Sequence, residues 1–436
     1  MRIKTRLWRL LAMLFAFTLV AAACGDDSGD DTAGDDTTDD TTDTTEADGG
    51  SADGVLAFGG LLPQTGDLAF LGPPEEAGVQ LAIEDVNAAG GVLGADVTFD
   101  PGDSGDTNTD IANQTTDRHL ANGVDAIIGA ASSGVSFTVI DKITGANVIQ
   151  FSGANTSPDF TEYDDNGLYF RTAPSDVLQG RVLSDLIVAD GNATVGIMAR
   201  QDPYGEGLLQ YTAEPLAEAG AEVLNDGGVV YDPAAENFDA EVGEIVAADP
   251  DAFVMIGFEE SAQILTSLFE AGYTQGDKNI YLVDGNIGNA LGENFTEPGI
   301  LEGIRGTLPS AEVTQEFKDR LLEIDPALED YSYAPENYDA IIITALAAEV
   351  AGTDDPVAVA AEINGVTRDG TTCTTFEECV ALVGEGEDID YDGVGGPYTF
   401  GDAGEPTEAS FVIQQYGPDN TIDDSLNEYQ FAAIEG

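Results

Sequence analysis

Two groups of residues could hold the opposite ends of a small zwitterion. Ser132-Ser133-Gly134 follows an apolar run, and hydroxyls with free backbone N–H groups at the start of a helix suit a carboxylate. Asp284 follows another apolar run, and its carboxylate could pair with an ammonium group. Plain helix capping by Ser133 or Ser136 would explain the serines equally well. The residue types therefore point to binding of a charged small molecule, with the capping alternative left open.

Aromatic and aliphatic residues near similar turns could line the rest of such a site. Tyr204 stands in the turn Asp202-Pro203-Tyr204-Gly205 and could lie along a ligand. The residues that could supply an apolar wall are Phe58, Phe70, Leu71 and Phe258. Ordinary core packing is the competing explanation, because it accounts for most large apolar side chains.

Motifs for catalysis are weak. No G-x-S-x-G turn, phosphate-binding loop or dinucleotide-binding glycine pattern follows a predicted strand. The single histidine, His119, is expected to be exposed on a helix, which leaves a triad with Ser133 little support. Residues 388–393 copy the opening of a calcium loop, but Thr399 stands where a glutamate ligand is needed. We therefore expect no enzyme, cofactor or metal; a secreted serine hydrolase using Ser133 is the remote alternative.

Alternating strands and helices must position these residues. The strand predictions are Val55–Leu62, Asp96–Asp100, Ala126–Gly129, Val148–Ser152, Thr194–Ala199, Glu222–Asn225, Ala252–Ile256 and Asn279–Val283. The helix predictions are Pro74–Ala89, Asp106–Asn122, Ser136–Thr144, Val177–Asp190, Gly205–Ala219, Asp239–Ala247 and Ser261–Ala271. Three further helices, at Val313–Ile324, Pro335–Val350 and Pro356–Asn364, precede two strands, at Pro397–Phe400 and Ser410–Tyr416.

The alternation predicts an α/β protein with two doubly wound parallel-sheet lobes. It runs once from Val55 to about Ala173 and again from about Pro174 to Gly306. Apolar strands that alternate with helices form parallel sheets with helices on both faces. In such open sheets, ligands bind outside the carboxyl ends of the strands. The turns that carry the candidate residues follow predicted strands, so they stand at those ends.

The start of the chain is typical of export from a bacterial cell. Basic residues precede an apolar segment at 10–20, and three alanines precede Cys24; this ending resembles a lipobox, in which the cysteine is lipidated. Residues 1–23 are predicted to be a signal peptide. Residues 24–54 are predicted to be the lipidated cysteine and an acidic tether without fixed structure. A chance cysteine beside an ordinary cleavage site is the alternative.

The amino-acid composition limits the kinds of partner that the protein can bind. With 14 basic residues against 82 acidic ones, the chain cannot neutralise phosphates, which excludes nucleic acid. The acidity is spread along the sequence, which favours adaptation to salt or a general acidic bias over steering of cationic ligands. Cys373 and Cys379 form a closely spaced pair, and outside the cytoplasm such a pair favours a local disulfide.

Eight segments occur in the order found in one known family. They are Pro63–Asp67, Gly78–Gly91, Ile128–Ser136, Asn155–Pro158, Phe170–Asp176, Tyr204–Gly207, Tyr338–Ala340 and Gly395–Pro397. Together they resemble type I periplasmic binding proteins of ABC importers, in the leucine/isoleucine/valine-binding branch. The matching segments span nearly all of residues 55–417.

The resemblance implies roles for individual residues. Ser133, the backbone of Ala154 and the hydroxyl of Thr156 would hold a ligand carboxylate, and Asp284 would take the ligand's amino group. The implied lining residues are Tyr204, Phe258 and Leu71, the last standing where a large aromatic is common.

The resemblance also implies three crossovers between the lobes, near Thr172–Pro174, Thr307–Pro309 and Gly395–Pro397. Residues 55–173 and 309–394 would form lobe 1, and residues 174–308 and 395–436 would form lobe 2.

These expectations describe a monomeric receptor held outside the cytoplasmic membrane, at the cell surface or in the periplasm, by a lipid on Cys24. It would close about a hinge over a small amino acid, branched-chain or aliphatic, and deliver it to the transmembrane subunits of an ABC permease. The alternatives keep the fold but bind an amide, urea or a polar amino acid, or serve a sensor.

Overall fold

The computed structural model describes residues 52–434. The predicted signal peptide, the lipidation site at Cys24 and nearly all of the predicted tether therefore lie outside the described residues. Within the described residues, no helix is both long and apolar enough to cross a membrane.

The first lobe is built on a parallel five-stranded sheet in the order β2-β1-β3-β4-β5. Its strands are β1 (Ala57–Leu61), β2 (Thr98–Asp100), β3 (Ala126–Gly129), β4 (Ile149–Ser152) and β5 (Tyr169–Arg171). Its early helices are α1 (Gly72–Ala88), α2 (Ile111–Asn122), α3 (Ser133–Gly145) and the 3-10 turn η1 (Pro158–Phe160).

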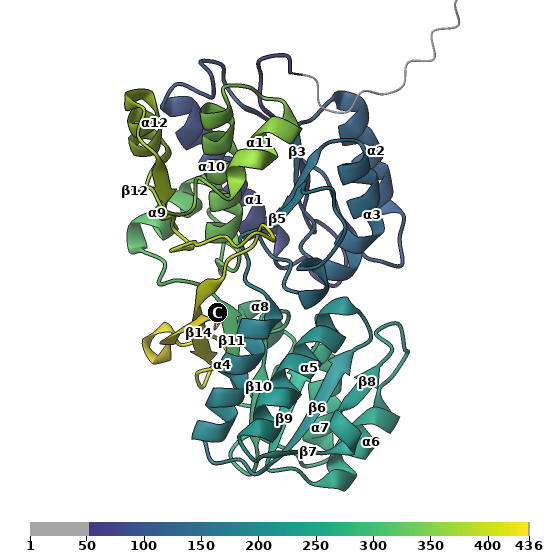
Figure 1. The fold of residues 1–436 in the computed structure, drawn as a ribbon. Helices are drawn as coiled ribbons and strands as arrows, with labels where there is room; N and C mark the ends of the chain where they lie inside the picture. The colour runs from purple at the N-terminus through teal and green to yellow at the C-terminus, as the bar shows by residue number, and fades with distance from the viewer. Residues whose placement is uncertain (1–51, 435–436) are drawn as a thin grey trace, which may run out of the picture. The chain divides into compact units, whose positions relative to one another are not determined.

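Four late helices return to this lobe. They are α9 (Gln315–Ile324), α10 (Ala334–Ala351), α11 (Pro356–Ile363) and α12 (Phe376–Glu385), accompanied by a small two-stranded sheet of β12 (Thr371–Cys373) and β13 (Ile389–Tyr391). The long α10 packs along α1, with α9 and α12 beside them (Figure 1). The predicted disulfide between Cys373 and Cys379 is confirmed, and it ties β12 to α12.

Strand β3 shows why this sheet is covered on both faces. Ala126 and Ile128 lie in the core that contains α1 and α10, whereas Ile127 lies in the core that contains α2 and α3. Successive side chains of a strand point to opposite faces. Because all of them are apolar here, both faces exclude water, as parallel sheets require.

The second lobe is built on a larger sheet in the order β15-β14-β11-β10-β9-β6-β7, with β8 also paired to β6. Its strands are β6 (Thr194–Arg200), β7 (Glu222–Val223), β8 (Val229–Tyr231), β9 (Ala252–Ile256), β10 (Asn279–Leu282), β11 (Arg305–Pro309), β14 (Glu408–Gln415) and β15 (Glu428–Ala433). Its helices are α4 (Asp176–Ala189), α5 (Pro203–Glu218), α6 (Asp239–Ala248), α7 (Ser261–Glu270) and α8 (Asn289–Gly292), with 3-10 turns η2 (Asn225–Gly227) and η3 (Asp424–Leu426).

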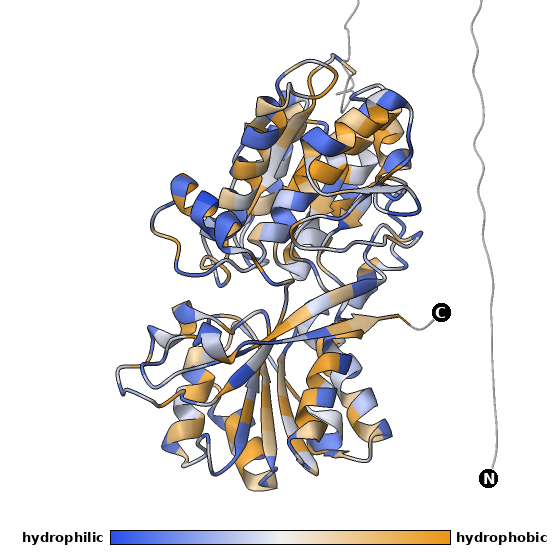
Figure 2. Ribbon diagram, turned by 90° about the vertical axis from the view of Figure 1, so that its left-hand side faces the viewer, coloured by the Kyte–Doolittle hydropathy of each residue, from blue (hydrophilic) through white to orange (hydrophobic). Residues whose placement is uncertain are grey.

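The fold class is confirmed. The central strands β6, β9 and β10 pair in parallel, and β14 and β15 join antiparallel at one edge. The middle strands of this sheet are mostly apolar (Figure 2), and every residue of β9 is buried. The described chain thus consists of two α/β lobes, each a β-sheet with helices packed on it.

The chain passes between the two sheets three times, and α10 anchors two of these connections. In the first, after β5, the hydroxyl of Thr172 donates to the carbonyl of Glu336 at 2.8 Å. In the third, the carboxylate of Asp339 accepts the N–H groups of Val394 at 3.2 Å and Gly395 at 2.7 Å. The hydroxyls of Tyr391 and Tyr398 also donate to it, at 2.6 and 2.9 Å.

Two boundaries differ from the predictions. Thr307–Pro309 belongs to β11 and pairs with β14, so the second connection begins only at Ser310. Residues 397–400 are not a strand, because Phe400 forms only an isolated bridge with Pro406. The tail enters the second sheet at β14, after residues 400–406 have packed on β5 through a bond from the Arg171 N–H to the Gly404 carbonyl.

A buried ion pair fastens the tail to β5, and it gives a test of stability. The side chain of Arg171 is fully buried, and its Nε donates to Glu405 at 2.8 Å. Replacing Glu405→Ala leaves a buried guanidinium unpaired, so we expect the free energy of unfolding to fall by about 3–5 kcal/mol. Chemical denaturation measures this loss.

The exposed pair Lys142–Asp117 is the control for that measurement. The Nζ of Lys142 lies 2.8 Å from the Oδ1 of Asp117, and 67 % of the Asp117 side chain is exposed. Asp117→Ala should therefore cost less than about 1 kcal/mol. Equal losses in the two variants would show that burial does not set the strength of these ion pairs.

Candidate ligand-binding site

The candidate site lies where the carboxyl ends of strands from both sheets face each other. In the first sheet the order of the strands reverses beside β1, and in the second it reverses beside β6. Ligands of open α/β sheets bind in the crevice at such a reversal. The loops after β1, β3 and β4 approach those after β6, β9 and β10 there.

A narrow cavity lies between these loops. All seven residues predicted to touch a ligand line it. The lining residues are Leu68, Leu71, Ala131, Ser133, Ala154, Thr156, Tyr204, Phe258, Asp284, Gly285 and Tyr333. Residues separated by more than 200 positions in the sequence therefore share one small enclosed space.

Hydroxyl and backbone groups of the first lobe form one end of the cavity. Ser132 caps α3, because its hydroxyl accepts the Val135 N–H at 3.4 Å. Ser133 is the first residue of the helix and accepts the Ser157 N–H at 3.3 Å. The alternative that Ser133 or Ser136 is the cap is thus wrong, and Ser133 lines the cavity instead. The Ala154 N–H donates to the Ser152 hydroxyl at 3.2 Å.

Asp284 forms the opposite end, and three side chains donate to its carboxylate. Tyr204 donates at 2.7 Å, Gln179 at 2.9 Å and Tyr333 at 2.7 Å. Burial raises the pKa of Asp284, and the three donors oppose that rise by stabilising the charged form. Burial and the charge of Asp284 also raise the pKa of both tyrosines, so they keep their protons. The carboxylate is thereby held in place while its charge stays in the cavity wall.

The aromatic side chains divide between wall and core. Tyr204 stacks on Phe258 with the ring centroids 5.3 Å apart, and the guanidinium carbon of Arg200 lies 3.6 Å from the Phe258 centroid. Phe258 is therefore fixed by its neighbours. Phe58, predicted as a possible wall residue, lies in the core under α1, so that prediction is wrong.

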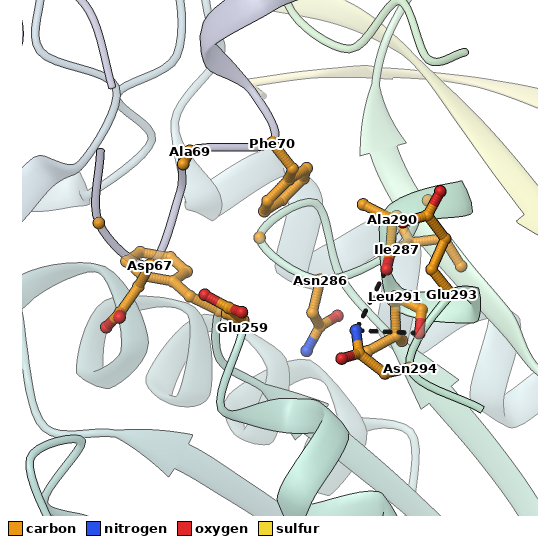
Figure 3. Close-up of a pocket in the computed structure, with 14 residues that line it drawn as sticks. Asp67, Ala69, Phe70, Glu259, Asn286, Ile287, Ala290, Leu291, Glu293 and Asn294 are labelled. Atoms are coloured by element: carbon orange, nitrogen blue, oxygen red, sulfur yellow. Dashed lines mark hydrogen bonds between the residues drawn. The ribbon is translucent and has the colours of Figure 1, made fainter. Parts of the chain in front are cut away.

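A second, wider chamber adjoins the cavity and shares Phe258 and Gly285 with it. Its volume is about 360 Å³. Asp67, Ala69 and Phe70 of the first lobe border it on one side (Figure 3). Loop residues of the second lobe, including Glu259 and Asn286, border it on the other side (Figure 3). A Cβ on Gly285 would stand 2.8 Å from the ring of Phe258, so glycine is needed where the two spaces meet.

Sequence reasoning missed two partners of Asp284. Tyr333 precedes α10 with a left-handed backbone, φ 61°, and Gln179 lies inside α4. Gln179 lies inside the helix predicted at Val177–Asp190, and Tyr333 stands just before the helix predicted at Pro335–Val350, so both elements were expected. No local pattern marks a helix residue as the partner of a carboxylate over 40 positions away, and neither could have been selected from the sequence.

His119 is buried and structural, contrary to the prediction that it is exposed. Its Nε2 lies 2.8 Å from the carbonyl oxygen of Gly60, and a Cβ on Gly59 would lie 2.7 Å from its ring. The hydroxyl of Ser133 pairs with Ser157 and not with this imidazole. The arrangement therefore gives a hydrolytic triad no support, and residues 52–434 contain no cluster of side chains suited to a metal ion.

Comparisons with known proteins agree with this geometry. Leu/Ile/Val-binding protein homolog 1 of Brucella suis biovar 1 is 29 % identical over 328 residues, covering 72 % of this chain and 83 % of the relative. LivJ of Streptococcus pneumoniae, solved in complex with isoleucine, has a TM-score of 0.70 at 21 % identity, covering 87 % of this chain and 100 % of that one. A solute-binding protein of an ABC transporter from R. palustris, in complex with benzoate, has a TM-score of 0.68 at 16 % identity, covering 88 % and 98 %.

A family model described as periplasmic binding protein matches residues 56–417. The predicted resemblance to type I periplasmic binding proteins of the leucine/isoleucine/valine branch is thereby confirmed. The chain belongs to the periplasmic binding protein family, whose members bind solutes and are not enzymes.

Proposed function

We propose that this chain is an extracytoplasmic receptor that closes over a small amino acid with a branched or aliphatic side chain and passes it to an ABC permease. One observation carries the proposal. The cavity between the lobes is lined by the hydroxyl-bearing residues Ser133 and Thr156 at one end and by Asp284 at the other. That polarity complements the two charges of an α-amino acid.

The ligand's carboxylate would lie against the first lobe. The Ser133 and Thr156 side chains and the backbone at Ala154 border this end, and the start of α3 contributes the positive end of a helix dipole. The ligand's ammonium group would lie against Asp284. The site would thus place each charge beside groups that favour it, in a space that excludes water.

The ligand's side chain would lie among apolar residues. Leu68, Leu71 and Phe258 line the cavity, and the adjoining chamber continues past Phe258. The leucine/isoleucine/valine names of the Brucella relatives and the isoleucine bound to LivJ support an aliphatic ligand. The benzoate complex shows that a protein of this fold can hold a ligand with a carboxylate and no amino group, so both ends of the ligand need testing.

Closure about the hinge would couple ligand binding to the equilibrium between the open and closed forms. Tyr333 reaches Asp284 from beside α10, and the Ser157 hydroxyl donates to the Pro203 carbonyl at 2.9 Å across the lobes. A ligand that bridges both lobes binds the closed form preferentially and shifts the equilibrium toward it. A permease that recognises the closed form would then receive only loaded receptors.

The proposed lipid on Cys24 would fasten the first lobe to the membrane. The carboxylate of Asp354 accepts the N–H groups of Asp53, Gly54 and Val55 at 3.0, 2.6 and 3.0 Å, so the chain enters this lobe at a fixed point. Replacing Cys24→Ser should move the exported protein from the membrane fraction to the soluble fraction, which immunoblotting of the separated fractions measures. An unchanged membrane fraction would contradict the anchor.

The ligand class can be tested by isothermal titration calorimetry with isoleucine and two analogues. The analogues are isoleucinamide, which lacks the carboxylate, and 3-methylvalerate, which lacks the amine. We expect each to bind at least about 30-fold more weakly than isoleucine, because each leaves a buried polar group of the site unpaired. Glutamine, urea and benzoate complete the panel, and tighter binding of any of these would favour an alternative ligand.

Asp284→Asn should weaken isoleucine binding by at least about 30-fold, because removing one member of a buried charge pair costs about 2–5 kcal/mol. The variant should bind 3-methylvalerate about as well as the wild type does, since that ligand has no amine to lose. Asp232→Asn, an exposed residue of the same lobe, is the control and should leave both affinities unchanged. An Asp284→Asn variant that binds isoleucine normally would refute the assignment.

A further inference from the structure

Asp176 is a buried carboxyl group for which the proposed ligand contacts have no use. It is the first residue of α4 and is fully buried. Among residues 52–434, neither of its side-chain oxygens has a hydrogen-bond partner. Its backbone N–H donates to the carbonyl of Thr156 at 2.8 Å, so it lies directly behind the loop that carries a predicted ligand contact.

Asp176 shares the wall behind the amino-group end of the site with Asp284. Gln179, three residues further along α4, donates to Asp284 at 2.9 Å. Burial and the charge of Asp284 raise the pKa of Asp176 well above its usual range. Donation from the nearby Thr156 hydroxyl and the positive charge of Arg171 oppose that rise, with smaller effects. Two carboxyl groups thus stand in one buried region.

The other charged or titratable neighbours do not neutralise this pair. They are Tyr204 of α5, Tyr333 beside α10, Asp202 before α5 and Arg171 of β5. The tyrosines keep their protons, and Asp202 adds negative charge. The guanidinium of Arg171 is bound to Glu405 and to the carbonyls of Ser157 and Asn155 at 2.8 and 3.2 Å.

The donors decide which carboxyl group carries the charge. Asp284 accepts three hydrogen bonds, which stabilise its ionised form. Neither side-chain oxygen of Asp176 has a partner in good hydrogen-bond geometry, and the nearby hydroxyl of Thr156 is the donor that favours its charged form. A buried carboxylate with so little support takes up a proton instead of remaining charged. When two carboxyl groups share one buried site, their pKa values move apart in the same way, so that one group stays ionised and the other keeps its proton.

We propose that Asp176 carries a proton in the closed protein and keeps the amino-group end of the site at a single negative charge, borne by Asp284. Asp176 is a positioning residue in this role, because it lies behind the cavity wall. The inference rests on the proposed function in taking the ligand's amino group to lie against Asp284. It deepens that function by making the site complementary to one ammonium group, and not to a neutral amide, to urea or to a dication.

Infrared spectroscopy of the full protein at about pH 8 tests where the proton lies. Other buried aspartates with raised pKa values, such as Asp339 at about 6 and Asp125 at about 7, are then mostly ionised. The difference between the wild type and Asp176→Asn should contain the carbonyl band of one protonated carboxylic acid, with or without isoleucine. Glu75→Gln, which removes another buried and unpartnered carboxyl, shows that such a band is detectable. A difference spectrum for Asp176→Asn without that band would overturn the proposal.

Calorimetry with isoleucine tests the role. Asp176→Asn imitates the protonated acid, so its affinity should stay within about threefold of the wild type, whereas Asp284→Asn loses at least about 30-fold. An equal loss in both variants would show that Asp176 is charged in the site and would overturn the proposal. If isoleucine binds neither the wild type nor the variants, the proposed function is wrong. The infrared band still shows whether Asp176 carries a proton.

The pH dependence of stability gives a second measurement, because a raised pKa of Asp176 predicts the direction in which the free energy of unfolding changes with pH. Above the ordinary aspartate pKa of about 3.9, the native protein would hold a proton on Asp176 that the unfolded chain lacks. The free energy of unfolding should therefore fall as the pH rises toward the raised pKa. Asp176→Asn should reduce that fall; an identical slope in both proteins would overturn the proposal. Should this variant not fold, isotope labelling of aspartate in the wild type would show whether a protonated aspartate band persists at about pH 8.

Discussion

The arrangement of the site depends on keeping one carboxylate charged inside the protein. Asp284 is only 4 % exposed, and a buried charge is tolerated only when donors surround it. Two of its donors, Tyr204 and Gln179, belong to the second lobe, and Tyr333 comes from beside α10. Because the set is completed only when the lobes meet, closure and the stability of this charge depend on each other.

The start of α10 links that charge to the connections between the lobes. Tyr333 contacts Asp284, Glu336 holds Thr172 of the first connection, and Asp339 holds Gly395 of the third. All three residues belong to the first two turns of α10 or directly precede it. A shift of this end of α10 would move the cavity wall and two of the three connections together, which gives hinge motion a direct physical route to the ligand.

The sequence predicted the position of a residue well where one local pattern determines that position. Polar turns after apolar strands predicted that Ser133, Thr156 and Asp284 would come together, and these residues line one cavity, because the carboxyl ends of parallel strands share one edge. Tyr333, Gln179 and Asp176 could not be found in this way, since only the packing of separate elements makes them neighbours. His119 shows the same limit: its burial depends on the missing side chain of Gly59, on a strand far from it in sequence. Residues 397–400 have strand-forming side chains but no adjacent strand to pair with.

The scarcity of cations explains how the protein treats its buried acids. The chain has 14 Lys and Arg residues against 82 Asp and Glu, so most buried carboxylates cannot rely on an ion pair. Asp339 is satisfied by two tyrosines and two N–H groups, Asp354 by three N–H groups, and Asp284 by two tyrosines and an amide. Hydrogen bonds from neutral donors stabilise a carboxylate without cancelling its charge. Asp284 therefore keeps a net charge that faces the cavity, and the amino group of the proposed ligand is suited to neutralise it there.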